Sequence, residues 1–392
     1  MTRRFPNAAF PVALGRPLLA AFIIAAVPAV AQAQSSWQAE WDRIVSSADA
    51  TWKTEWDRLV AGARKEGEVV MVVPPSRTHR DFLAREWPKA YPEIKISMTT
   101  IAGPQLLPRF KVEREGGKYL WDLVLTGTEN GFQLRDAGFA DPVLPEFVLP
   151  DVKDPKTWGG WETAFFDNER KYVFATRSFL KMPYYNAKLL SPGKVEQQGV
   201  KVLIDPELKG KVIWHEPTAG GSGRTFGPVM MRMLGDDGFR KLVQEQTVFV
   251  SAMNDVVERM ARGQFAVGLG PVMTQLLGRY KKAGVDFDIR PLGNTPKYGA
   301  YGNTGGSNAI VVKDRPHSNA TRVFLNWYMS KPVATALSAA MGEDSRRTDV
   351  PAVAPVDERR VPGVDYWEAQ REEYDADFER ARRLILEFRG KS

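Results

Sequence analysis

The stretch EVVMVVPPSRTHRDFLAREWPKAYPEIKISM, residues 68–98, decides the fold of this chain. Residues 68–73 form an apolar, mostly β-branched run followed by two prolines, which predicts a buried strand. Residues 81–90 have the apolar spacing of a helix, and residues 94–98 predict a second strand. The same alternation continues with a helix at 104–114, a strand at 120–125 and a helix at 129–137. This pattern predicts a mostly parallel sheet that is covered by helices on both faces.

A second series of strands and helices follows further along the chain. We expect strands at 211–214, 247–250 and 266–269 and helices at 224–234, 239–244 and 254–262. Extended stretches at 172–185 and 307–312 lie on either side of this series, and a helix at 319–329 follows the latter. The fold class is therefore α/β: two lobes, each a mostly parallel sheet flanked by helices, joined by two crossover strands that leave a hinge and a cleft.

The first 33 residues have the pattern of an export signal. Two arginines precede an apolar run at 18–30, and residues 31–33 (AQA) form a small–x–small cleavage site. We therefore expect an exported protein that is cleaved near Ala33. A retained membrane anchor is the alternative, which the shortness of the apolar run disfavours.

The composition restricts the chemistry of the mature chain. Its 392 residues include no cysteine and three histidines, which excludes disulfides and thiolate nucleophiles and leaves little for a metal centre. The formal charge of +7 falls to +4 once the three arginines of the leader are removed, too little to indicate nucleic acid binding. Neither HExxH nor Gly-x-Ser-x-Gly occurs. We expect a protein that is not an enzyme, with no cofactor, no metal and no nucleic acid partner.

Both ends of the mature chain predict helices outside the two series. Residues 37–63 carry apolar side chains on one helical face and contain the motif Trp-x-x-Glu-Trp-Asp-Arg twice, which predicts one helix extended by duplication. We expect this tryptophan stripe to pack on its own domain, with a docking surface for a partner as the alternative. Residues 364–388 predict a long packing helix. The expected units are 1–33, the leader; 34–66, the tryptophan-rich segment; 67–178, the first part of lobe 1; 179–304, lobe 2; and 305–392, the return to lobe 1 with the C-terminal helices.

Polar loops follow the expected strands of both lobes, where ligands of open α/β sheets bind. In the strongest candidate, the loop at 215–225, glycines permit close approach of the backbone, hydroxyls can donate, and Arg224 can bind a carboxylate or phosphate. The expected anion receptor comprises Ser76, Arg77, Thr78, Thr126, Gly127, Thr128, Tyr185, Gly221, Ser222, Gly223, Arg224, Thr225, Asn303 and Thr304. The alternatives are that the glycines form only a tight turn and that His215 and Glu216 bind a metal.

Six short segments occur in an order that is specific to one family. They are EWDRLV with ARKEGEVV (55–70), YN (185–186), DPELKGKV (205–212), EPT (216–218), RGQFAVG (262–268) and PHSNA (316–320). On these segments the chain resembles the extracellular solute-binding proteins of ABC importers, the two-lobed type II group that includes ferric-ion, thiamine and phosphonate binders. The resemblance covers about residues 55–350. It implies a periplasmic receptor, expected to be a monomer, that closes its lobes on a small solute and delivers it to an inner-membrane permease.

The ligand does not carry over from the family so directly. Ferric-binding members hold iron with two adjacent tyrosines after the strand that corresponds to 266–269, and here residues 270–273 read GPVM. Because hydroxyls, glycines and arginines suit oxyanions, we expect a small anionic solute, a carboxylate or a phosphorylated compound. Ferric-iron binding is the first alternative, and an exported hydrolase on the same two lobes is the second.

Overall fold

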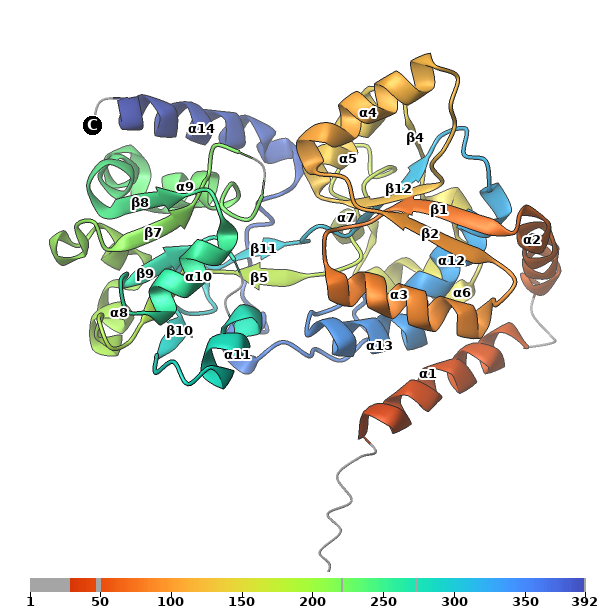
Figure 1. Cartoon of the computed structure of the whole chain (residues 1–392), viewed down its shortest axis with the longest axis horizontal. Helices are drawn as coiled ribbons and strands as arrows, with labels where there is room; N and C mark the ends of the chain where they lie inside the picture. Colours follow the sequence, from red (N-terminus) through yellow and green to blue (C-terminus); the bar gives the residue numbers. More distant parts are fainter. Residues whose placement is uncertain (1–28, 47–50, 220, 272–273, 391–392) are drawn as a thin grey trace, which may run out of the picture.

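The computed structural model describes residues 29–46, 51–219, 221–271 and 274–390 of the chain. It is a mixed α/β protein of two lobes, each built around a five-stranded sheet, with a two-stranded ribbon between them (Figure 1). The predicted fold class is therefore confirmed. Most of the expected leader, residues 1–28, lies outside the described residues. None of the described helices is long and apolar enough to cross a membrane.

The sheet of lobe 1 is mostly parallel. Its order is β2–β1–β3–β12–β4, with β1 parallel to β2 and β3, and with β12 antiparallel to β3 and β4. The strands are β1 (Glu68–Val72), β2 (Lys95–Thr99), β3 (Leu123–Thr126), β4 (Ala140–Asp141) and β12 (Asn308–Val312). In β3, Leu123 and Leu125 pack into one core cluster, whereas Val124 packs into another. Burial on both faces explains why the strands read as continuous apolar runs.

Helices cover both faces of this sheet (Figure 1). One face carries α3 (Arg77–Ala90), α12 (Ser318–Met329) and α13 (Lys331–Met341), and the other carries α4 (Gly103–Glu115) and α5 (Thr128–Asp136). The short helices α6 (Pro150–Lys153) and α7 (Trp161–Ala164) precede the first crossover. Because β1 and β3 are parallel and lead directly into α3 and α5, these two helices begin at the same edge of the sheet.

Lobe 2 is built around a sheet of order β10–β6–β9–β7–β8. Its elements are β6 (Tyr184–Asn186), α8 (Pro192–Gln198), β7 (Val212–His215), α9 (Phe226–Lys241), β8 (Thr247–Val250), α10 (Met253–Ala261), β9 (Val267–Leu269), α11 (Thr274–Lys282) and β10 (Ile289–Pro291). β7 is parallel to β8 and β9, whereas β6 is antiparallel to β9 and β10. The two helices expected at 224–234 and 239–244 meet within α9 at Gly235, whose φ of 68° is a left-handed value that glycine adopts readily.

Two strands carry the chain between the lobes, as predicted, but the expected return strand at 307–312 is wrong, because those residues form β12 inside the lobe 1 sheet. β5 (Phe179–Lys181) leads from lobe 1 to lobe 2, and β11 (Tyr301–Asn303) leads back. The two strands pair antiparallel, with Leu180 opposite Gly302. The crossovers therefore form one hydrogen-bonded ribbon, at the place where the sequence predicts a hinge.

The C-terminal segment crosses between the lobes once more. α14 (Asp375–Gly390) packs against α9, and its Ile385 is fully buried in the core of lobe 2. Just before α14, Glu372 accepts two hydrogen bonds from the Arg135 guanidinium of α5, at 2.7 and 2.5 Å, on lobe 1. The helix expected at 364–388 therefore forms only in its second half, because the residues of the first half run in a non-helical path to their contact with lobe 1. The last of the expected units is divided between the two lobes.

The tryptophan-rich segment forms two helices and not the expected single one. They are α1 (Ala29–Val45) and α2 (Lys53–Glu66). Trp41 of α1 meets Trp56 of α2 edge to face at 5.8 Å, so the two copies of the repeat face each other instead of continuing along one axis. Trp37 packs edge to face on a tryptophan of α12, at 6.0 Å. These rings lie in the core of lobe 1, which confirms that the segment packs on its own domain.

Candidate functional site

The glycine-rich loop after β7 folds back onto the end of that strand. Trp214 of β7 donates from Nε1 to the carbonyl of Gly223 at 3.0 Å. A Cβ on Gly223 would lie 1.8 Å from the carbonyl oxygen of His215, so only glycine permits this approach. Gly221 has a φ of +125°, which also favours glycine. The two glycines thus hold the loop against β7 and place residues 222–225 at the start of α9.

Ser222 is held by the histidine that ends β7. Its Oγ lies 2.9 Å from Nδ1 of His215, and Nε2 of the same ring lies 3.2 Å from the carbonyl oxygen of Ser251. Because a carbonyl oxygen only accepts, the ring proton belongs on Nε2, and Nδ1 accepts from the Ser222 hydroxyl. Burial lowers the pKa of His215, which keeps the ring neutral. Ser222 can donate to a ligand only after it turns away from this ring.

A lysine that the sequence analysis missed lies beneath the loop. Lys181 of β5 is 8% exposed, and its Nζ donates to the Ser222 carbonyl at 2.8 Å and to Thr225 Oγ1 at 3.4 Å. Thr225 Oγ1 lies 2.6 Å from the Tyr301 hydroxyl of β11. Burial alone lowers the pKa of Lys181 to about 7. The signal available in the sequence was a charged side chain within the apolar crossover stretch.

Arg224 connects the loop to lobe 1 and to the C-terminal helix. Its guanidinium forms ion pairs with Glu129 of α5 and with Glu379 of α14, the latter at 3.2 Å, and lies 5.2 Å from the Phe378 ring. Since Glu129 directly follows Thr128, the glycine–serine loop and the threonine turn meet at one lobe interface, as expected from the strand ends. The carboxylates that Arg224 binds here belong to the protein itself, so an anionic solute would have to displace one of them.

The threonine turn of lobe 1 stands at the start of a helix. Thr126 Oγ1 accepts from Asn130 Nδ2 at 3.0 Å, and the Thr126 carbonyl accepts from Asn308 Nδ2 at 2.9 Å. Thr128 is buried, and Gly127 precedes α5 as an N-cap residue with no side-chain oxygen to offer. The first N–H groups of α5 are therefore left without a side-chain cap.

The turn after β1 is more open. Ser76 caps α3, with its Oγ accepting from the backbone N–H of His79 at 3.3 Å. Thr78 is exposed, and the exposed Arg77 pairs with Asp81 one helical turn further on, at 3.4 Å. An exposed pair of this kind is weak, so Arg77 is held in place only loosely.

Three expected site residues are engaged inside the protein. Tyr185 is 5% exposed and belongs to the core of lobe 2. Asn303 accepts from the N–H of Gly305 at 2.8 Å within its own turn. The N–H and the hydroxyl of Thr304 both contact Gln370 Oε1, at 2.8 and 3.2 Å. The expectation that these side chains face a ligand is therefore corrected: tertiary packing turns each of them toward a partner in the hinge or in the core.

The pair considered for a metal diverges. His215 contacts Ser222 and Ser251, whereas Glu216 forms an ion pair with Arg389 at 3.0 Å. Adjacent residues at the end of a strand point in opposite directions, which explains the divergence. Among the residues that the structure describes, no group of three or more His, Asp or Glu side chains is arranged to hold a metal ion.

Comparison with known proteins identifies the family and the fold. The profile of the family described as bacterial extracellular solute-binding protein matches residues 83–360. No curated protein sequence matches the chain. The iron-bound HitA of Pseudomonas aeruginosa superposes with a TM-score of 0.59 at 14% identity, over 82% of this chain and 99% of that one. A Trichodesmium protein, IdiA (FutA), in complex with iron and citrate gives 0.61 at 16% identity, over 82% and 99%.

AfuA of Actinobacillus pleuropneumoniae with fructose-6-phosphate bound superposes with a TM-score of 0.56 at 18% identity, over 82% of this chain and 97% of that one. At such low identity these structures show only the fold, which is that of two-lobed periplasmic binding proteins of type II. The profile match begins within α3 and ends before α14, so it includes the whole sheet of lobe 2, the ribbon between the lobes and every strand of the lobe 1 sheet except β1. The chain therefore belongs to the bacterial extracellular solute-binding protein family.

Proposed function

We propose that the protein is the solute receptor of a bacterial ABC importer and that it captures a small organic anion, a carboxylate or a phosphorylated compound, between its lobes. The observation that carries this proposal is the buried Lys181 beneath the glycine-rich loop. Its Nζ is held by a carbonyl and a hydroxyl, and burial alone sets its lowered pKa. Because a buried base without a counter-charge is costly to protonate, an anion at this loop would supply the missing charge.

The neighbouring groups support an anion at the same place. Lys181 Nζ donates to the Ser222 carbonyl and to the Thr225 hydroxyl, and the Ser222 hydroxyl lies in the same loop on Nδ1 of His215. Arg224 is shared between carboxylates of two different elements. Opening of the hinge would separate Glu129 from the loop and free one edge of the guanidinium. Charge-assisted hydrogen bonds to an anionic solute could then replace that ion pair.

Arg224 and Glu129 give a matched pair of variants. We expect Arg224→Ala to weaken binding of the solute at least roughly tenfold, because a hydrogen bond to a charged group is lost. Glu129→Gln removes only the competing carboxylate, so affinity is expected to stay the same or to rise. Isothermal calorimetry with the solute that copurifies measures both. Unchanged affinity in Arg224→Ala would remove this residue from the binding site.

Lys181 predicts a pH dependence of binding. Its folded pKa of about 7 lies below the ordinary 10.5, so the free protein releases this proton above pH 7. An anion raises that pKa and must take the proton up again, so affinity is expected to fall as pH rises above 7, by up to about tenfold per pH unit. Calorimetry at pH 8 in buffers of different ionisation enthalpy is expected to show uptake of close to one proton.

The control for this experiment is a surface lysine of lobe 2. Lys181→Met is expected to abolish the proton uptake and to flatten the pH profile. Lys188 pairs with Asp286 on the surface, so Lys188→Met should leave both unchanged. Equal uptake by the native protein and Lys181→Met would show that another group takes the proton.

The solute itself is identified by native mass spectrometry of the protein purified from its host. A panel of iron-free anions (inorganic phosphate, citrate and fructose 6-phosphate) is then tested by calorimetry. We expect at least one of them to bind. Ferric citrate tests the iron alternative, since tyrosinate bound to ferric iron gives a visible charge-transfer band. A coloured complex, with no binding of iron-free anions, would replace the anion proposal by ferric transport.

The contact between Ser222 and His215 is the observation that favours the hydrolase alternative. The second ring nitrogen faces a backbone carbonyl and not a carboxylate, so the usual orienting group of a catalytic triad is replaced by a weaker one. Turnover of ester or phosphoester substrates that is lost in Ser222→Ala would support an enzyme. If no such turnover is found, the proposal of a solute receptor stands.

The same proposal includes the partner and the compartment. A receptor of this kind releases its solute to an inner-membrane permease. Cleavage near Ala33 would remove the leader and deliver the mature protein to the periplasm; because α1 begins at Ala29, the cut would fall within the start of this helix.

A further inference from the structure

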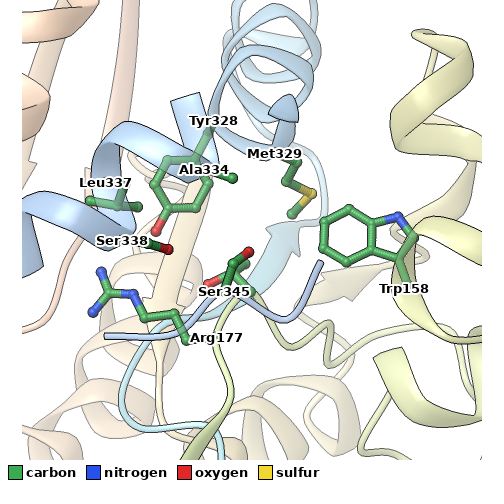
Figure 2. A pocket seen from close by; sticks show the side chains of 9 residues that line it. Trp158, Arg177, Tyr328, Met329, Ala334, Leu337, Ser338 and Ser345 are labelled. Carbon is green, nitrogen blue, oxygen red and sulfur yellow. The ribbon is translucent and has the colours of Figure 1, made fainter. Parts of the chain in front are cut away.

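A small pocket lies in lobe 1, between α12, α13 and the segment that leads into β5 (Figure 2). None of the residues that line it belongs to the loops expected to bind the solute. The cavity measures about 20 Å³, on a scale on which one water or ion occupies about 10–15 Å³. The pocket therefore has room for a single water-sized body or ion, and not for a metabolite.

Arg177 supplies the charge of this pocket. Its side chain is 7% exposed, and its Nη1 pairs with Glu343. Among the described residues, Nε and Nη2 of this guanidinium have no hydrogen bond of good geometry, although the Tyr328 hydroxyl is near enough to help Glu343 raise the pKa of Arg177 against the effect of burial. These two nitrogens form the side edge of the guanidinium, whose two parallel N–H groups suit a carboxylate or a single anion. A buried edge without an acceptor is unfavourable, so an acceptor is expected there.

Two hydroxyls lie on the same side of the pocket as the guanidinium. Figure 2 shows the side chains of Tyr328 and Ser338 on this side, across from Trp158. Tyr328 Oη lies 3.2 Å from Nε2 of the buried His79, and Nδ1 of that ring has no partner among the described residues. When the ring carries its proton on Nε2 and donates it to Tyr328, the tyrosine hydrogen is free to turn toward the cavity.

The local charge also favours an anion. Burial is the main cause of the lowered pKa of His79, and the positive charges of Arg177 and Arg80 lower it further. The ring is therefore neutral at ordinary pH, so it adds no charge of its own. Met329 and Leu337 line the rest of the pocket with apolar surface, which disfavours a hydrated cation or a multiply charged ion.

We propose that this pocket binds one small monoanion, a halide or formate, on the Nε–Nη2 edge of Arg177 with the Tyr328 and Ser338 hydroxyls as further donors. The site is independent of the solute proposed for the lobe interface. Because the anion binds only the folded protein, its occupancy stabilises the fold. A free halide and a formate share this chemistry, and the two are compared in the test.

The test measures thermal unfolding in sodium bromide, sodium formate and sodium gluconate at equal ionic strength, since gluconate is too large for the cavity. We expect a saturable rise of roughly 2 °C with bromide or formate at about ten times Kd and no rise with gluconate. Crystals soaked in bromide are expected to show an anomalous peak beside Arg177. A peak without a saturable shift in solution would mean an adventitious ion only, and would overturn the proposal.

Variants of the pocket separate this site from general salt effects. Arg177→Lys is expected to lose the bromide response, because lysine cannot present the side edge. Ser338→Ala, a smaller change that preserves the ion pair with Glu343, is expected to raise the bromide Kd severalfold. Arg371→Lys is the control outside the pocket and should respond like the native protein. A response that persists in both pocket variants, or equal curves for bromide and gluconate, would reject the site and leave water as its occupant.

Discussion

Gly223→Ala is expected to abolish most of the solute affinity, by at least roughly a hundredfold. The added Cβ would lie 1.8 Å from the carbonyl oxygen of His215, and neither atom can move away without a shift of its backbone, unlike the end of a flexible side chain. The loop must therefore move away from β7, and the hydrogen bond from Trp214 to the Gly223 carbonyl is lost with it. Two charge-assisted hydrogen bonds to the anion, each contributing about 1.5–3 kcal/mol, account for this size of effect.

The control for this variant is a glycine with open space around it. Gly278 of α11 has nothing within 4 Å of an added Cβ, so Gly278→Ala is expected to bind normally and to gain up to about 1 kcal/mol of stability. Calorimetry gives the affinities, and circular dichroism verifies that both variants fold. Native affinity in a folded Gly223→Ala protein would show that the loop does not hold the solute.

Trp327→Ala is expected to cost about 3–5 kcal/mol of unfolding free energy, the largest effect on stability. Trp327 of α12 is fully buried and meets the rings of Trp37, Trp87 and Phe324 at 6.0, 5.1 and 5.7 Å. It thus joins α1 and α3 to its own helix, α12. Deleting the indole leaves a cavity where three elements meet, which cannot collapse without moving all of them.

Trp327→Phe gives the comparison for this loss. The Nε1 of Trp327 has no hydrogen-bond partner among the described residues, so replacing indole by phenyl removes volume and no hydrogen bond. We expect the phenylalanine variant to retain most of the free energy of unfolding measured in urea, with an unchanged dependence of that free energy on urea concentration. A loss below about 1 kcal/mol in Trp327→Ala would contradict the packing described for lobe 1.

Much of the fold follows from local pattern. The run EVVMVV predicts β1 because a parallel strand buried on both faces needs apolar side chains at every position, whatever its neighbours. The glycine-rich loop after β7 is visible in the sequence for a similarly local reason, since only glycine permits the approach of Gly223 to its own strand. The tryptophan repeat shows the limit of such reasoning, because its spacing fits one long helix as well as two facing ones.

The chain by itself determined most of the strands and helices of the two sheets, the presence of two crossovers and the polar loops, because hydrophobic spacing depends on which face of each element is buried. Only the tertiary structure decided which side chains meet. Arg224 lies 95 residues from Glu129 and 155 from Glu379, yet it pairs with both. Lys181 extends from the ribbon between the lobes to the glycine-rich loop after β7. α14, at the end of the chain, packs on lobe 2. Partners so distant in sequence are brought together by the packing of whole lobes, and the local hydrophobic pattern gives no information about that packing.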